Sequence, residues 1–175
     1  MDLVEVMEKH SIRMDGNYFS GTYMRDREGA PYAAFGSALP VRFCQPNGRV
    51  LNVYQQHTHL TDDGSFGPDQ EYSFKFSPET FSTILDRIYT DIVTRFHTPY
   101  AVCIHPSNWV KFSGEQGREL LRQARQKKLP IWSFDQWADF WDARDGYRIE
   151  NLTWDGSELT FDLHGQTSHP DLRFL

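Results

Sequence analysis

The sequence predicts an α/β fold, because helical patterns alternate with short apolar runs in the second half of the chain. Ser77 precedes Pro78 at the start of a helical pattern, an order that suits the N-cap and the first helical position. The nearly continuous apolar run 100–106 is typical of a strand buried on both faces. Ser133 and Gln136 then have the spacing of a capping box. Such an alternation is the pattern of a parallel sheet or a barrel.

The N-terminal part is more irregular. Residues 2–10 form a short helical pattern that leads at once into a strand-like stretch. Residues 21–40 are rich in Gly, Ala, Pro and Tyr, which predicts a long loop. Two short strands at 40–43 and 50–54 flank Asn47-Gly48, a strong turn signal. This region therefore predicts a β-hairpin after a loop.

Two further helices and a strand are expected after residue 106. A helix over 114–128 has Leu120, Leu121 and Ala124 as its expected core face. Residues 129–132 are expected to form a short strand, and a helix from Ser133 ends near residue 146.

The pattern changes after residue 146. Residues 147–154 and 158–163 are strand-like and flank Asp155-Gly156, which predicts an antiparallel hairpin. We therefore expect two domains, 1–146 with the alternating elements and 147–175 with the start of a β-rich module.

Composition narrows the function classes. The net charge of −6 without a basic stripe makes nucleic acid an unexpected partner. No window is apolar enough to span a membrane, and the first ten residues contain no signal-peptide core, so the localisation stays open. Cys44 and Cys103 lie in apolar runs that predict buried thiols, and a disulfide between them stays open. The aromatic share of 15% suits both core packing and sugar-stacking surfaces.

Several short segments resemble the C-terminal half of bacterial polysaccharide-deacetylase-like proteins. They are residues 11–15 (SIRMD), 36–43 (GSALPVRF), 53–56 (VYQQ), 104–106 (IHP) and 130–133 (PIWS). The resemblance extends over about residues 1–163 and implies part of a distorted (β/α) barrel followed by a β-rich module.

The resemblance also implies an activity, the metal-assisted hydrolysis of acetyl groups on a sugar polymer. In that family a divalent ion is held by two His and an Asp, and a late His gives a proton to the leaving group. The family's Thr-Phe-Asp-Asp, His-Ser/Thr-x-x-His and Arg-x-Pro-Tyr segments are absent from this sequence. We therefore expect a polysaccharide or oligosaccharide partner, leave the cofactor open, and expect the chain alone to be an incomplete enzyme.

Three residues are candidates for the site. His105 occupies the position of the family's late His, at the C-terminal end of the predicted strand where barrel enzymes place catalytic groups. Trp109 follows in the next loop and is a candidate for stacking on a sugar ring, and Asp15 is a candidate for binding a sugar hydroxyl. We expect His105 and Trp109 to line the mouth of the main cleft. A histidine bonded to neighbouring backbone, a tryptophan capping the fold and a turn-capping aspartate are the structural alternatives.

Two other functions stay open. One is a non-catalytic carbohydrate-binding or interaction module on the same scaffold. The other is a metal hydrolase centred on His57 and His59, whose alternate positions on an extended strand place both imidazoles on one side, with Asp62 or Asp63 as a third ligand.

Overall fold

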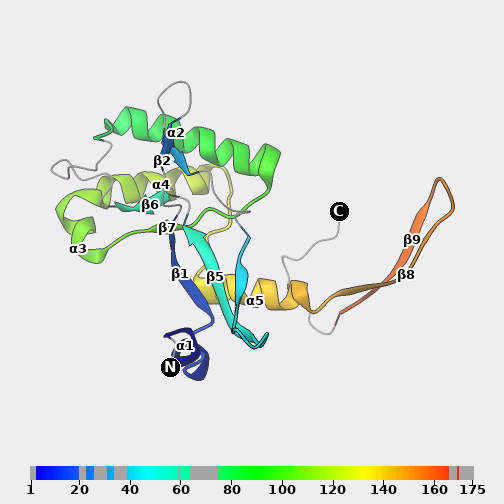
Figure 1. The fold of residues 1–175 in the computed structure, drawn as a ribbon. Coiled ribbons are helices and arrows are strands. Elements are labelled where there is room, and N and C mark those ends of the chain that lie inside the picture. The colour runs from blue at the N-terminus through cyan, green and yellow to red at the C-terminus, as the bar shows by residue number, and fades with distance from the viewer. Residues whose placement is uncertain are drawn as a thin grey trace. The chain divides into compact units, whose positions relative to one another are not determined.

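Three strands in the first part of the chain form a small mixed sheet (Figure 1). The computed structural model describes residues 3–19, 23–25, 31–33, 39–58, 60–63, 75–165 and 169. The chain divides into two compact units, Met1–Ile131 and Trp132–Leu175. This division assigns the last helix to the second unit, whereas the sequence pattern placed the domain boundary after residue 146.

The mixed sheet has the strand order β1 (Met14–Phe19), β5 (Val50–Thr58), β4 (Val41–Cys44). β1 runs parallel to β5, and β4 runs antiparallel to it, so β4 and β5 form the predicted hairpin. Gly48 has φ +89° in the turn, a backbone region that favours glycine. The second half of β5 is buried through Gln56, His57 and Thr58, so the strand carries polar side chains into the interior.

The predicted N-terminal helix is confirmed as α1 (Leu3–Lys9). Glu8 accepts hydrogen bonds from Arg49 Nη1 (2.9 Å) and from the backbone N–H of Asn52 (2.7 Å), which join α1 to β5. The expected loop 21–40 contains two short antiparallel strands, β2 (Tyr23–Arg25) and β3 (Pro31–Ala33). The loop prediction was wrong for the residues of these two strands. Proline does not prevent a strand here, because Pro31 stands at the first position of β3, where a strand tolerates it.

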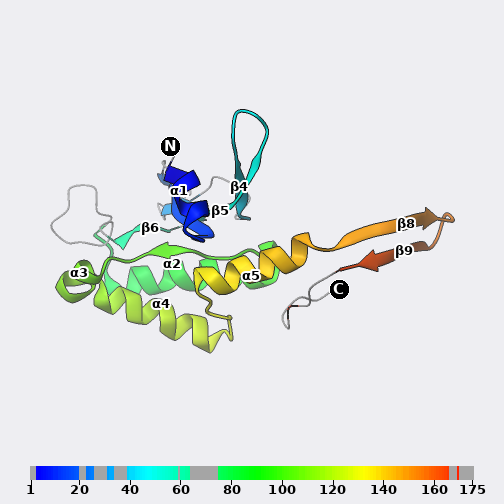
Figure 2. The same ribbon diagram turned by 90° about the horizontal axis from the view of Figure 1, so that it is seen from below.

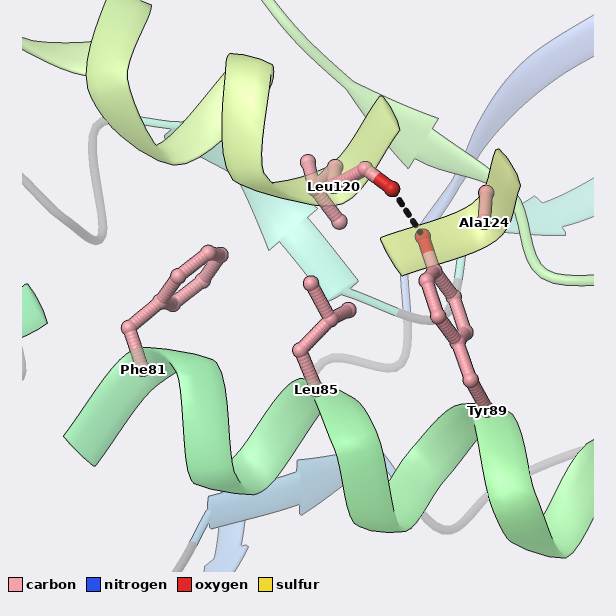
Figure 3. Packing of buried hydrophobic residues seen from close by; sticks show 5 residues of the cluster. All are labelled: Phe81, Leu85, Tyr89, Leu120 and Ala124. Atoms are coloured by element: carbon pink, nitrogen blue, oxygen red, sulfur yellow. Dashed lines mark hydrogen bonds between the residues drawn. The ribbon is translucent and has the colours of Figure 1, made fainter. Parts of the chain in front are cut away.

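Helices α2 (Pro78–Asp91) and α4 (Gly114–Gln126) run side by side and make the main core (Figure 2). The predicted N-cap is confirmed, because Ser77 Oγ accepts a hydrogen bond from Thr80 N (3.2 Å). A π-helical turn over Ile92–Phe96 ends α2, and His97 follows with a left-handed φ of 48°. Figure 3 shows the core residues facing one another between the helices: Phe81, Leu85, Tyr89, Leu120 and Ala124. Leu121, expected in this core, is exposed because it lies on the outer side of α4.

The predicted central strand over 100–105 is wrong in extent and position. β7 (Val102–Cys103) has two residues and pairs in parallel with β6 (Leu60–Asp62), and Val102 is exposed. Tyr100 and Ile104 instead pack against the core between α2 and α4. The apolar character of this segment therefore arises from contacts with helices rather than with strands on both sides.

The strand expected at 129–132 is also absent, since residues 127–133 form neither helix nor strand. Lys128 has φ +57°, and the backbone N–H of Leu129 returns to the carbonyl of Ala124 (2.9 Å). Leu129 is thus part of the end of α4 and packs on the core, and Pro130 has no N–H with which to continue a strand.

The second unit begins with an aromatic cluster on α5 (Phe134–Asp145). The predicted capping box is confirmed, because the Ser133 side chain and the Gln136 side chain each bond the other residue's backbone N–H. Trp132, Trp137 and Phe140 lie with ring centroids 5.3 to 5.8 Å apart, and Trp137 also meets the buried Trp141 edge-on. The aromatic residues of this segment therefore pack on one another.

The predicted C-terminal hairpin is confirmed as β8 (Arg148–Trp154) and β9 (Leu159–His164). Its cross-strand register places Ile149, Trp154, Leu159 and Phe161 on one face, where each is exposed by 46% to 62%. The opposite face is polar. The hairpin thus has one open apolar face.

The described strands form short separate sheets, β1-β5-β4, β2-β3, β6-β7 and β8-β9, and no closed barrel. The fold is mixed α/β, as the sequence predicts. Within the described ranges no helix combines the length and apolar character needed to cross a bilayer. Cys44 is exposed and Cys103 half-buried, and the two do not form a disulfide with each other. The prediction of a buried thiol was therefore wrong for Cys44 at the edge of the sheet.

Candidate active site

Asp63 and His105 meet where two parallel strands end. β6 ends at Asp62 and β7 at Cys103, and these two residues are partners in the strand register. Because the C-terminal ends of parallel strands lie at one edge, the residues that follow come together. His105 Nδ1 lies 2.8 Å from Asp63 Oδ1, although the two residues are 42 positions apart in the sequence.

Asp63 is almost fully enclosed and accepts several hydrogen bonds. Its relative exposure is 1%. Oδ1 accepts from His105 Nδ1 and from Asn108 Nδ2 (3.0 Å), and Oδ2 accepts from Ser113 Oγ (2.6 Å) and from the His105 backbone N–H (3.2 Å). Burial raises the pKa of Asp63, but hydrogen bonds from Ser113, His105 and Asn108 outweigh it and hold the pKa below its ordinary value. The carboxylate is therefore ionised at neutral pH.

The His105 side chain extends from this carboxylate toward solvent. Its exposed fraction is 45%, against 1% for Asp63. An ionised carboxylate opposite Nδ1 favours the tautomer with the proton on Nδ1, so the imidazole can exchange a proton with another molecule at Nε2. An exposed imidazole oriented by a buried carboxylate is an arrangement suited to general acid–base chemistry.

Trp109 lies close to His105 in the chain and packs on α4. A Cβ at Gly117 would lie 2.0 Å from the Trp109 ring, and the guanidinium of Arg118 lies 6.0 Å from the ring centroid. One side of the indole is thus in contact with the helix, and the side chain is half-buried. Its expected role in stacking on sugar stays a prediction.

Asp15 has contacts within the β1–β5 pair. Its Oδ1 accepts a hydrogen bond from Asn17 N (3.1 Å), and its Oδ2 lies 3.5 Å from Gln55 Nε2. These contacts fix the local turn and the register with β5. The structure shows no contact of Asp15 with the Asp63–His105 pair among the described residues, and its sugar-binding role stays a prediction.

Of the rival metal site, the side chains of His57 and Asp63 lie among the described residues. His57 is 4% exposed, and burial lowers its pKa. His59 and the side chain of Asp62 lie outside the described residues, and Asp63 accepts hydrogen bonds from His105 and its neighbours. Within the described ranges no three His, Cys, Asp or Glu side chains form a group that can hold a metal ion.

A separate cavity of about 380 Å³ lies between α2 and α4. Its lining includes Ser82, Glu115, Glu119 and Arg122, and hydrogen bonds, first of all from Arg122, lower the pKa of Glu119 to about 2. Neither His105 nor Trp109 lines this cavity, and their expected place at the mouth of the main cleft stays a prediction.

Ser113 and Asn108 are site residues that the sequence did not indicate. The segment from Pro106 to Ser113 was expected to be a loop, whereas it forms α3 (Pro106–Asn108) and a π-helical turn (Trp109–Ser113). Only the helical periodicity in the HPSNW segment could have placed Asn108 one turn after His105.

Comparisons with known proteins give no relative on which to base a function. No family model matches the chain, and neither the curated proteins nor the solved structures contain a match.

The pKa of Asp63 leads to a prediction about stability. A carboxyl whose pKa is lower in the folded state stabilises the fold above its unfolded pKa and loses that contribution as the pH falls through its folded pKa. We expect Asp63→Asn to lower the free energy of unfolding at pH 7 by about 1 to 3 kcal/mol, because buried donors lose their acceptor. Below a pH of about 4 the difference from the unmodified protein should shrink.

Urea unfolding at a series of pH values checks this prediction. A constant difference between Asp63→Asn and the unmodified protein from pH 7 down to about 2 would show that this carboxylate does not contribute to the pH dependence.

Proposed function

We propose that this chain supplies the general acid of a polysaccharide-deacetylase-like hydrolase, which removes acetyl groups from a sugar polymer. The observation that carries the proposal is the 2.8 Å contact between the buried carboxylate of Asp63 and the half-exposed imidazole of His105. His105 is also the residue at the position of the family's late histidine. The contact is a feature of the geometry and the position of His105 rests on the sequence resemblance, so neither depends on the other.

The proposed proton transfer follows from this geometry. In the reactive state His105 is an imidazolium whose Nδ1–H donates to Asp63 and whose Nε2–H faces the substrate. Water adds to the acetyl carbonyl and loses one proton to bulk solvent, and the bond from the carbonyl carbon to the sugar nitrogen or oxygen then breaks. The leaving atom takes the Nε2 proton, the sugar amine or alcohol is released with acetic acid, which ionises to acetate, and the neutral imidazole takes up a proton from solvent. Asp63 stabilises the imidazolium and fixes its orientation, as a buried carboxylate does in a hydrolase triad.

The divalent metal that the resemblance implies does not fit the described residues. The two oxygens of Asp63 each accept hydrogen bonds from two donors, so this carboxylate faces N–H and O–H groups and not a cation. His57 is buried, and among the described residues it belongs to no group of three His, Cys, Asp or Glu side chains that can hold a metal ion. The chemistry assigned to this chain is thus the proton transfer by His105 alone.

The finer architecture is part of the same proposal. The parallel pairs β1–β5 and β6–β7, with His105 after the end of β7, support a segment of a (β/α) barrel, whose catalytic groups stand at the C-terminal ends of strands. The open apolar face of the β8–β9 hairpin supports the start of a β-rich module, because a two-stranded sheet is marginally stable by itself.

Acetate release from acetylated oligosaccharides by the native, full-length protein tests the proposal. We expect acetate to appear without new reducing ends, which separates deacetylation from glycosidic cleavage. Sugar binding without acetate release would instead favour the non-catalytic carbohydrate-binding module. Absence of both would remove the carbohydrate assignment.

A further inference from the structure

Two side chains from one short segment complete the surroundings of Asp63. Asn108 and Ser113 both lie in the eight residues that follow His105, and the backbone N–H groups of Asn108 and Trp109 donate to the carbonyl of His105 (3.0 and 2.9 Å). The segment is therefore anchored to the same backbone that carries the histidine.

Packing leaves this segment little freedom to shift. A Cβ at Gly114 would lie 2.6 Å from the Trp109 carbonyl oxygen, and a Cβ at Gly117 would overlap the Trp109 ring. Contacts this close require glycine, so the π-helical turn lies directly against α4. Ser113, at the end of that turn, is 1% exposed.

The hydrogen bonds divide evenly between the two carboxylate oxygens. Oδ1 accepts from His105 Nδ1 and Asn108 Nδ2, and Oδ2 accepts from Ser113 Oγ and the His105 backbone N–H. Rotation of the Asp63 carboxylate would break bonds at both oxygens together. Asn108 and Ser113 thus each hold one oxygen, and Oδ1 stays opposite the histidine ring.

We propose that Asn108 and Ser113 are positioning residues that hold Asp63 in the orientation from which it accepts a hydrogen bond from the Nδ1–H of His105. Their effect on turnover rests on the proposed function, whereas their effect on the imidazole tautomer does not. Neither side chain needs to touch a substrate. They act through Asp63, whose orientation selects which ring nitrogen of His105 carries the proton in the neutral imidazole.

The test compares Ser113→Ala and Asn108→Ala with Ser107→Ala, an exposed serine in α3 that serves as the matched control. The first readout is the tautomer of His105, measured by long-range ¹H–¹⁵N NMR in the native protein. We expect the neutral ring to carry its proton on Nδ1 in the unmodified protein and in the control. In the two other variants a substantial fraction should move to the Nε2–H tautomer.

The second readout is the rate of acetate release. We expect kcat to fall about 10-fold in Ser113→Ala and Asn108→Ala while KM changes by less than about twofold, because supporting side chains near a reactive group typically have effects of this size. The control should keep both values.

The outcomes separate the two proposals. An unmodified protein that releases no acetate removes the proposed function, and the NMR result still decides the positioning role. An unchanged His105 tautomer in both variants, together with a changed tautomer in Asp63→Ala, would overturn the inference. If Ser113→Ala does not fold, the tautomer in Asn108→Ala tests the positioning role, because the Asn108 side chain is only half-buried and its truncation disturbs the fold less.

Discussion

Replacement of His105 by alanine should lower the kcat of acetate release by a factor of about 10² to 10⁴, the usual contribution of a general acid. The fold and the thermal midpoint should change little, because the imidazole is 45% exposed and its removal leaves no large cavity. The measurement is steady-state acetate release by the native, full-length protein, with thermal unfolding of the same samples.

His164→Ala is the matched control for this variant. His164 is also an exposed histidine beside a carboxylate, with Nε2 3.7 Å from Glu150 Oε2, but it lies on the β8–β9 hairpin. It should keep the unmodified rate. If His105→Ala releases acetate at the rate of the unmodified protein, the assignment of His105 as the general acid is wrong.

The largest effect on stability should come from Leu85→Ala. Leu85 is 1% exposed in the core between α2 and α4, and truncation of such a leucine removes buried methyl groups and leaves a cavity. We expect the free energy of unfolding to fall by about 2 to 5 kcal/mol. Urea unfolding followed by circular dichroism measures the loss.

Val93→Ala provides the comparison for Leu85→Ala. Val93 is 44% exposed in the π-helical turn after α2, so its truncation should cost much less. A Leu85→Ala variant no less stable than Val93→Ala would show that these helices do not pack as described.

Local chemistry explains which elements the sequence predicts. Ser77 with Pro78, and Ser133 with Gln136, place helix starts because an N-cap depends on a few neighbouring residues. The glycine of each hairpin turn predicts the turn for the same reason, and Gly156 has φ +104°.

The two strand predictions that were wrong concern segments whose structure depends on tertiary contacts. The apolar run 100–106 indicates burial without indicating what buries it. Tyr100 and Ile104 pack on the core between α2 and α4, while Val102 is exposed. Residues 129–132 have an apolar pattern, but Leu129 closes the end of α4 and Pro130 cannot donate a ladder hydrogen bond.

The candidate site was predicted in part. His105 was indicated by its place after an apolar run, and Asp63 was noted only as a ligand of a different site. Their contact depends on the pairing of β6 with β7, which brings together residues 42 positions apart. No local pattern encodes that pairing, and the same holds for Ser113, which reaches Asp63 across 50 positions.

The most direct test of the proposed account is the kcat of the double variant Asp63→Asn, His105→Ala beside its two single variants. If Asp63 acts only through His105, the double variant should be no slower than His105→Ala, because residues that act as a unit have non-additive effects on rate. Multiplication of the two single losses in the double variant would contradict the account, because it would mean that Asp63 and His105 contribute separately to the reaction.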